Sequence, residues 1–78
     1  MKKNLVMPRL REEMRSGVLC AWLKEEGEAY QKGEPIFEIE TDKVVNQVEA
    51  AADGVMLRQL VEEGDEVPAE AAVAEVEE

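Results

Sequence analysis

Two halves of this 78-residue chain align without a gap when residue 17 is placed on residue 54. The segment GVLCAWLKEEGEAYQKGEPIFEIET then runs beside GVMLRQLVEEGDEVPAEAAVAEVEE. Eight identities result, four of them at glycines and turn acids: Gly17/Gly54, Val18/Val55, Leu23/Leu60, Glu25/Glu62, Glu26/Glu63, Gly27/Gly64, Glu38/Glu75 and Glu40/Glu77. Such a repeat predicts a fold built from two similar halves related by an approximate two-fold axis.

Each half has the pattern of short strands joined by tight turns. A strand-compatible run follows the leading glycine, an E-E-G-[ED] turn comes next, and an apolar/acidic alternation ends the half. Gly27 and Gly64 stand where such turns favour a positive φ. In the first alternation Phe37 and Ile39 face one way and are core candidates, whereas Ile36 faces the other way with the acids.

The coarse secondary-structure prediction contains strands and no helix. We expect strands near residues 3–7, 17–24, 29–31, 35–40, 44–49, 54–61, 66–68 and 72–77. Residues 10–17 are helix-friendly but too few for an isolated helix, so they are predicted to form a loop. Residues 68–78 have helix propensity, but their alignment with the first half predicts a strand at the end. Eight strands in so short a chain indicate an all-β sandwich or flattened barrel.

Charge and residue inventory exclude several functions. Nineteen acidic against nine basic residues give a net charge of −10, which argues against nucleic acid and anionic membranes as partners. There is no histidine and one cysteine, so neither a Ser-His-Asp triad nor a His/Cys zinc site can form, and no metal site is predicted. Cys20 lies in an apolar stretch and is predicted to be a buried small hydrophobe in a reducing, intracellular compartment.

Residues 38–45, EIETDKVV, predict a hairpin whose two-residue loop is Asp42-Lys43. In this register Thr41 faces Val44 across the strands. Tight hairpin turns favour Gly or Asn at the second loop position, where this chain has Lys43. The approximate two-fold axis places this tip at the pole opposite the termini. The sequence therefore predicts an exposed amine on a protruding tip, with an ordinary solvated lysine as the alternative.

Several segments together resemble the lipoyl domain of 2-oxo acid dehydrogenase complexes over nearly the whole chain. The matching pieces, in order, are MPRL (7–10), Gly17, WLKEEGE (22–28), GEPIFEIETDKV (33–44), ADGV (52–55) and VEEGDEV (61–67). E-T-D-K-V is the signature around the lipoylated lysine of that family. The resemblance implies a flattened β-barrel or sandwich of two four-stranded antiparallel sheets with internal pseudo-two-fold symmetry, a barrel-sandwich hybrid.

The resemblance also implies a role for each residue at the tip. Lys43 would carry covalently attached lipoic acid as a lipoamide, with Glu40, Thr41, Asp42 and Val44 as candidate recognition residues. Residues 1–78 would form a single lipoyl domain, the N-terminal domain of a longer dihydrolipoamide acyltransferase chain. The domain itself would be a monomeric, non-catalytic carrier in the cytoplasm, in a bacterium rather than in a mitochondrial matrix.

The implied partners are the other components of such a complex. They are a thiamine-diphosphate-dependent 2-oxo acid decarboxylase, the acyltransferase catalytic domain, dihydrolipoamide dehydrogenase and the lipoylating enzyme. The lipoyl group would act as a swinging arm that shuttles acyl groups and electrons between their active sites. The 2-oxo acid itself cannot be read from this chain, because the decarboxylase selects it.

Two features depart from the family pattern, and three rival functions stay open. Residues 11–16 replace a Gly-Glu-Ser type loop that helps partner recognition in the family. The register that pairs Phe37 with Val48 puts Asn46 on the face of Phe37, where the family usually has an apolar residue.

A biotinyl carrier domain of a biotin-dependent carboxylase usually flanks its lysine with methionines, whereas Asp42 and Val44 stand here. A glycine-cleavage carrier protein and an unmodified lipoyl-like interaction domain complete the set of rivals.

Overall fold

The computed structural model describes residues 1–78 and contains eight strands and no helix. The strands are β1 (Lys2–Val6), β2 (Ser16–Trp22), β3 (Ala29–Tyr30), β4 (Pro35–Thr41), β5 (Val44–Glu49), β6 (Gly54–Gln59), β7 (Glu66–Pro68) and β8 (Ala72–Glu77). Every predicted strand is present, and the loop predicted over residues 10–17 covers residues 10–15, because β2 already begins at Ser16. A membrane-spanning helix is absent from the structure.

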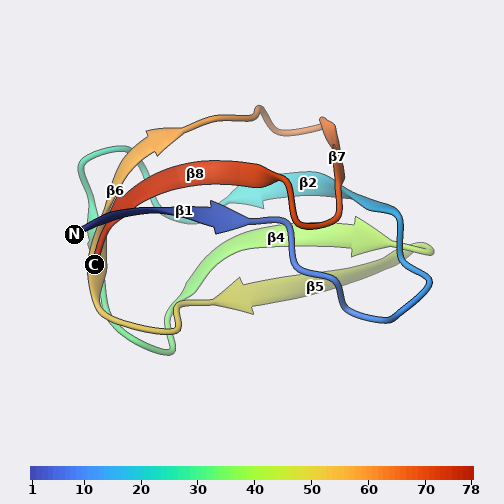
Figure 1. The fold of residues 1–78 in the computed structure, drawn as a ribbon, viewed down its shortest axis with the longest axis horizontal. Coiled ribbons are helices and arrows are strands. Elements are labelled where there is room, and N and C mark those ends of the chain that lie inside the picture. Colours follow the sequence, from blue (N-terminus) through green and yellow to red (C-terminus); the bar gives the residue numbers. More distant parts are fainter.

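The strands form two four-stranded antiparallel sheets, in the orders β1-β8-β6-β3 and β5-β4-β2-β7. The two sheets have the same arrangement of equivalent strands. In sheet order, β1 is equivalent to β5, β8 to β4, β6 to β2 and β3 to β7. The sheets face each other as a flattened sandwich, and the barrel is not closed. Figure 1 shows the two termini side by side at one end and the turn between β4 and β5 at the other. The predicted fold class, pseudo-symmetry and opposite poles are confirmed.

The E-E-G turns interlock the two halves. Gly27 N–H donates to the carbonyl oxygen of Met56 at 2.6 Å, and Gly64 N–H donates to that of Leu19 at 2.7 Å. Both glycines have the predicted positive φ, at 87° and 96°. Because each turn bonds to the strand of the other half, neither half can form its complete hydrogen-bond network alone.

Strands β2 and β6 each end two residues before their predicted ends, at corresponding positions. One further bond to the neighbouring strand follows each strand end: Leu23 N–H donates to the carbonyl oxygen of Ile36 on β4 at 2.8 Å, and Leu60 N–H donates to that of Val73 on β8 at 2.9 Å. The strand-compatible sequence continues through these residues, so composition alone could not place the end of each strand.

The core lies between the two sheets and contains thirteen buried apolar residues: Met7, Met14, Leu19, Tyr30, Ile36, Phe37, Ile39, Ala50, Met56, Val67, Val73, Ala74 and Val76. Phe37 and Ile39 are buried as predicted, and the Trp22 ring packs against Phe37 with ring centroids 5.5 Å apart. The prediction that Ile36 faces outward was wrong, because a register shift between Pro35 and Phe37 breaks the alternation and turns both Ile36 and Phe37 inward.

The prediction of a buried Cys20 was also wrong, since its side chain is half-buried. It neighbours the fully buried Leu19 on β2 and therefore lies on the outer face of the sheet. Burial raises the pKa of the Cys20 thiol, and the carboxylates of Glu40 and Glu38 raise it further. The thiol therefore has little thiolate character at neutral pH and is a weak nucleophile.

Asn46 occupies the position in the β4–β5 pair that the sequence predicted. It is opposite Ile39 in the β4–β5 ladder, and Phe37 is opposite Val48, so the predicted register is confirmed. Strand β5 is an edge strand, and Asn46 is half-buried there. The amide of Asn46 keeps contact with solvent at this edge, which explains how a polar residue is tolerated on the inner face.

Candidate attachment site at the β4–β5 hairpin

The hairpin between β4 and β5 has the predicted two-residue loop, because Thr41 pairs with Val44 and leaves Asp42 and Lys43 between them. Both loop residues have positive φ, 51° for Asp42 and 65° for Lys43. Positive φ at both central residues is the signature of a type I′ turn, which normally takes Asn and Gly. Holding a side chain other than glycine in this region costs roughly 1 kcal/mol or more. The turn therefore keeps its lysine at an energetic cost.

Lys43 is exposed at the outer end of this turn. None of the eight ion pairs in the structure involves it. Lys24 provides a contrast, since its side chain is only 15% exposed and its Nζ lies 3.3 Å from a carboxylate oxygen of Glu34. Of these two amines, Lys43 is the one that another enzyme can reach without first breaking an ion pair.

The four predicted recognition residues differ in solvent exposure. Asp42 and Val44 are exposed on either side of Lys43, and Val44 is 57% exposed. Glu40 is half-buried on the outer face of β4. Thr41 is only 8% exposed and lies beneath the turn, so its side chain supports the hairpin from the inside.

Val45 is an exposed apolar residue that the sequence prediction missed. It is 55% exposed beside Val44, at the start of β5. Strand alternation predicts that one of two adjacent valines is buried, but neither is, because this end of the hairpin extends beyond the opposite sheet. The tip thus presents a small apolar surface next to the amine.

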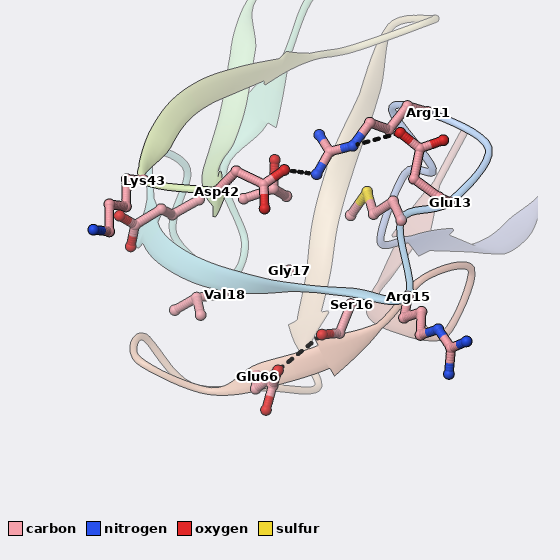
Figure 2. Close-up of a pocket in the computed structure, with 12 residues that line it drawn as sticks. Arg11, Glu13, Arg15, Ser16, Gly17, Val18, Asp42, Lys43 and Glu66 are labelled. Carbon is pink, nitrogen blue, oxygen red and sulfur yellow. Dashed lines mark hydrogen bonds and ion pairs between the residues drawn. The ribbon is translucent and has the colours of Figure 1, made fainter.

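A shallow groove of about 500 Å³ lies beside the hairpin tip. Its walls come from the loop before β2, from the start of β2 and from the hairpin, and Figure 2 shows these elements around the Arg11–Asp42 ion pair. Sequence reasoning missed this pair, because 31 positions separate two residues of opposite charge in a chain rich in charges. The groove is lined mostly by polar and charged side chains, and the structure has no cluster of three or more metal-ligating side chains.

These features together define a class of protein. A β-sandwich presents a primary amine outside every ion pair at its apex, beside a shallow polar groove. Such a site suits covalent attachment of a prosthetic group by another enzyme better than it suits catalysis. The fold and site therefore define a small carrier domain with a lysine attachment point.

Comparison with known proteins identifies the family. A family model described as "Biotin-requiring enzyme", the biotin/lipoyl family, matches residues 3–76. The dihydrolipoyllysine-residue acetyltransferase component of the acetoin cleaving system of Pseudomonas putida is 39% identical over 73 residues, 94% of this chain and 20% of the relative. The dihydrolipoyllysine-residue succinyltransferase component of the 2-oxoglutarate dehydrogenase complex of Staphylococcus saprophyticus is 42% identical over 70 residues, 90% of this chain and 16% of the relative.

A solved structure matches over almost its whole length. The lipoyl domain of the 2-oxoglutarate dehydrogenase complex of Azotobacter vinelandii has a TM-score of 0.79 and 37% identity, over 96% of this chain and 95% of that one. The chain belongs to the biotin/lipoyl family and is a lipoyl domain of the 2-oxo acid dehydrogenase acyltransferase type. As such it is a carrier and not itself a catalyst. It spans about a fifth of the length of the curated relatives.

Proposed function

We propose that Lys43 is the attachment site of this lipoyl domain and carries lipoic acid as an amide on Nζ. The observation that carries the proposal is the unpaired amine at the tip of a type I′ hairpin, within the run E-T-D-K-V. The surroundings fit such a group, since the lysine is exposed and no ion pair has to be broken before the amide forms. Glu40, Asp42 and Val44 are the proposed surface contacts for the lipoylating enzyme.

A bound lipoyl group supplies a dithiolane that can take up an acyl group and two electrons. The contribution of this chain is to hold that group at a fixed point and to leave it free of the domain surface. The polar groove beside Lys43 offers an apolar arm little burial, which supports this freedom. A tethered group reaches successive active sites at a high effective concentration without any new contact.

We propose that the domain serves a 2-oxo acid dehydrogenase complex as part of a longer acyltransferase chain. This domain spans only 20% and 16% of the two curated acyltransferase relatives, which supports a role as one part of a longer chain. Its partners would be a thiamine-diphosphate-dependent decarboxylase, the acyltransferase domain, dihydrolipoamide dehydrogenase and a lipoylating enzyme. The bacterial relatives and the unpaired Cys20 support a cytoplasmic location.

The attachment site is tested by mass spectrometry of the domain expressed with a lipoylating enzyme and lipoic acid. We expect one lipoyl increment on the wild type and none on Lys43→Arg. Lys32→Arg is the matched control, because Lys32 is also an exposed turn lysine, and it should keep the increment. An increment that survives in Lys43→Arg would contradict the proposed site.

The carrier function is tested in a reconstituted complex whose acyltransferase chain lacks its own lipoyl domain. The wild-type domain fused to that chain should restore turnover of a 2-oxo acid, and the Lys43→Arg fusion should not. Turnover by the Lys43→Arg fusion would exclude the carrier function.

A further inference from the structure

The loop before β2 is packed against the base of the β4–β5 hairpin. Met7 and Met14 at either end of this loop are 0% and 2% exposed. Met7 Sδ, Met14 Cε and Thr41 Cγ2 lie 3.1, 3.2 and 3.4 Å from the position that a Cβ on Gly17 would take. Loop, strand β2 and hairpin therefore meet in one packed layer, which has no room for a side chain at Gly17 unless these side chains shift.

Arg9 fixes the shape of this loop from within. Its Nη1 donates to the carbonyl oxygens of Glu12, at 3.3 Å, and of Met14. Its Nε lies 3.3 Å from a carboxylate oxygen of Glu70, so the loop is also joined to the segment before β8. A loop closed by guanidinium–carbonyl bonds and anchored by two buried methionines is a preformed support.

Arg11 connects this support to the turn that holds Lys43. Its Nη2 forms an ion pair with the carboxylate of Asp42, and its Nε lies 3.2 Å from a carboxylate oxygen of Glu13. Figure 2 shows the guanidinium between these two carboxylates, while the Lys43 side chain points away from it. Arg11 therefore contacts the residue before the lysine and not the lysine itself.

We propose that Arg11 is a positioning residue for Lys43. Its ion pair with Asp42 holds a turn without glycine in its positive-φ conformation, so that the amine faces the lipoylating enzyme in one orientation. Without this tether, the cost of positive φ at Asp42 and Lys43 favours other turn conformations. The role in lipoylation rests on the proposed function of Lys43, whereas the effect on the turn does not.

The first test is made on the unmodified domain by NMR. We expect Arg11→Gln to lower the heteronuclear ¹⁵N NOE of the Lys43 and Val44 amides and to leave the rest of the hairpin unchanged. The matched control is Arg58→Gln, which removes another exposed Arg–Glu pair, to Glu75, on the other sheet. Equal NOE values at Lys43 in the two variants would overturn the proposal.

The second test is a double-mutant cycle on the initial rate of lipoylation at low salt. Arg11→Gln should lower kcat/KM by about two- to five-fold, the range that one exposed ion pair supports. In an Asp42→Asn background the same substitution should have no further effect. At about 1 M salt, where charges are screened beyond about 3 Å, wild type and Arg11→Gln should converge.

Two results would overturn the positioning role. An Arg11→Gln effect that persists in full in the Asp42→Asn background would mean that Arg11 contacts the enzyme directly. An Arg11→Gln rate equal to the Arg58→Gln rate would mean that the ion pair has no influence. If the wild type is not lipoylated at all, the proposed function fails, and the NMR comparison still decides whether Arg11 orders the turn.

Discussion

Gly17 and Gly54 occupy corresponding positions in the two halves, yet alanine should have very different effects at them. At Gly54 an added Cβ would lie 2.6 Å from the backbone oxygen of Glu77, 2.7 Å from Glu78 Cγ and 2.7 Å from Tyr30 Oη. At Gly17 the nearest atoms are the ends of two methionine side chains, at 3.1 and 3.2 Å. The backbone at Glu77 cannot move without breaking the β6–β8 ladder, whereas the two methionine side chains can adopt other rotamers.

The expected magnitudes follow from these contacts. Gly54→Ala overpacks a rigid site and should cost about 2–3 kcal/mol or more of unfolding free energy. In Gly17→Ala the two methionine side chains need to move by only a few tenths of an ångström. Alanine also lowers the conformational entropy of the unfolded chain, which stabilises the folded state by about 0.4–1 kcal/mol and offsets part of that cost. We therefore expect Gly17→Ala to stay within about 1 kcal/mol of wild type.

Urea unfolding followed by the fluorescence of Trp22, the single tryptophan, measures both effects. With a slope of about 1 kcal/mol/M for a small domain, Gly54→Ala should lower the midpoint by about 2–3 M, or prevent folding, and Gly17→Ala by less than about 1 M. Equal shifts of the urea midpoint in the two variants, or a larger shift for Gly17→Ala, would refute the argument that the contacts of the added Cβ decide the cost.

Other predictions concern Tyr30 and Cys20. Tyr30→Phe removes the hydroxyl that donates to Glu78 at 2.6 Å and should cost about 1–2 kcal/mol in urea unfolding; no loss would mean that this bond is not formed in solution. Burial, and then the bond to Glu78, raise the pKa of Tyr30 above its ordinary value of 10.0. This stabilisation is present below pH 10 and is lost as the pH rises further, so the urea midpoint of wild type should fall more steeply there than that of Tyr30→Phe. Because its pKa is raised, Cys20 should react with iodoacetamide at pH 8 more slowly than a free thiol, and a faster reaction would contradict its described environment.

The internal repeat accounts for much of what the sequence could predict. It places Gly27 and Gly64 in equivalent turns, and the structure gives them nearly equal positive φ. Glu70, which corresponds to Gly33, also has positive φ, 73° against 90°, although it is not a glycine. Backbone geometry therefore follows the repeat even where the residue type does not, because strand pairing fixes the turn conformation.

Features that depend on local irregularity or on distant pairs could not be predicted. The bulge that turns Ile36 inward comes from the mismatch between β4 and β5, and no residue type signals it. The Arg11–Asp42 pair joins a loop to a hairpin that only the folded sandwich brings together. At the candidate attachment site the sequence predicted the exposed Lys43 and its two-residue turn, whereas the burial of Thr41 and the exposure of Val45 required the structure.

The most direct measurement of the central account is a competition on one sample of the domain. The domain is incubated with a lipoylating enzyme, a biotinylating enzyme and both acids, and the increment is located by fragmentation of the intact protein. The account predicts a single lipoyl increment on Lys43 and no biotinyl increment. A biotinyl group at Lys43, a lipoyl group on another lysine, or an unmodified domain would contradict it.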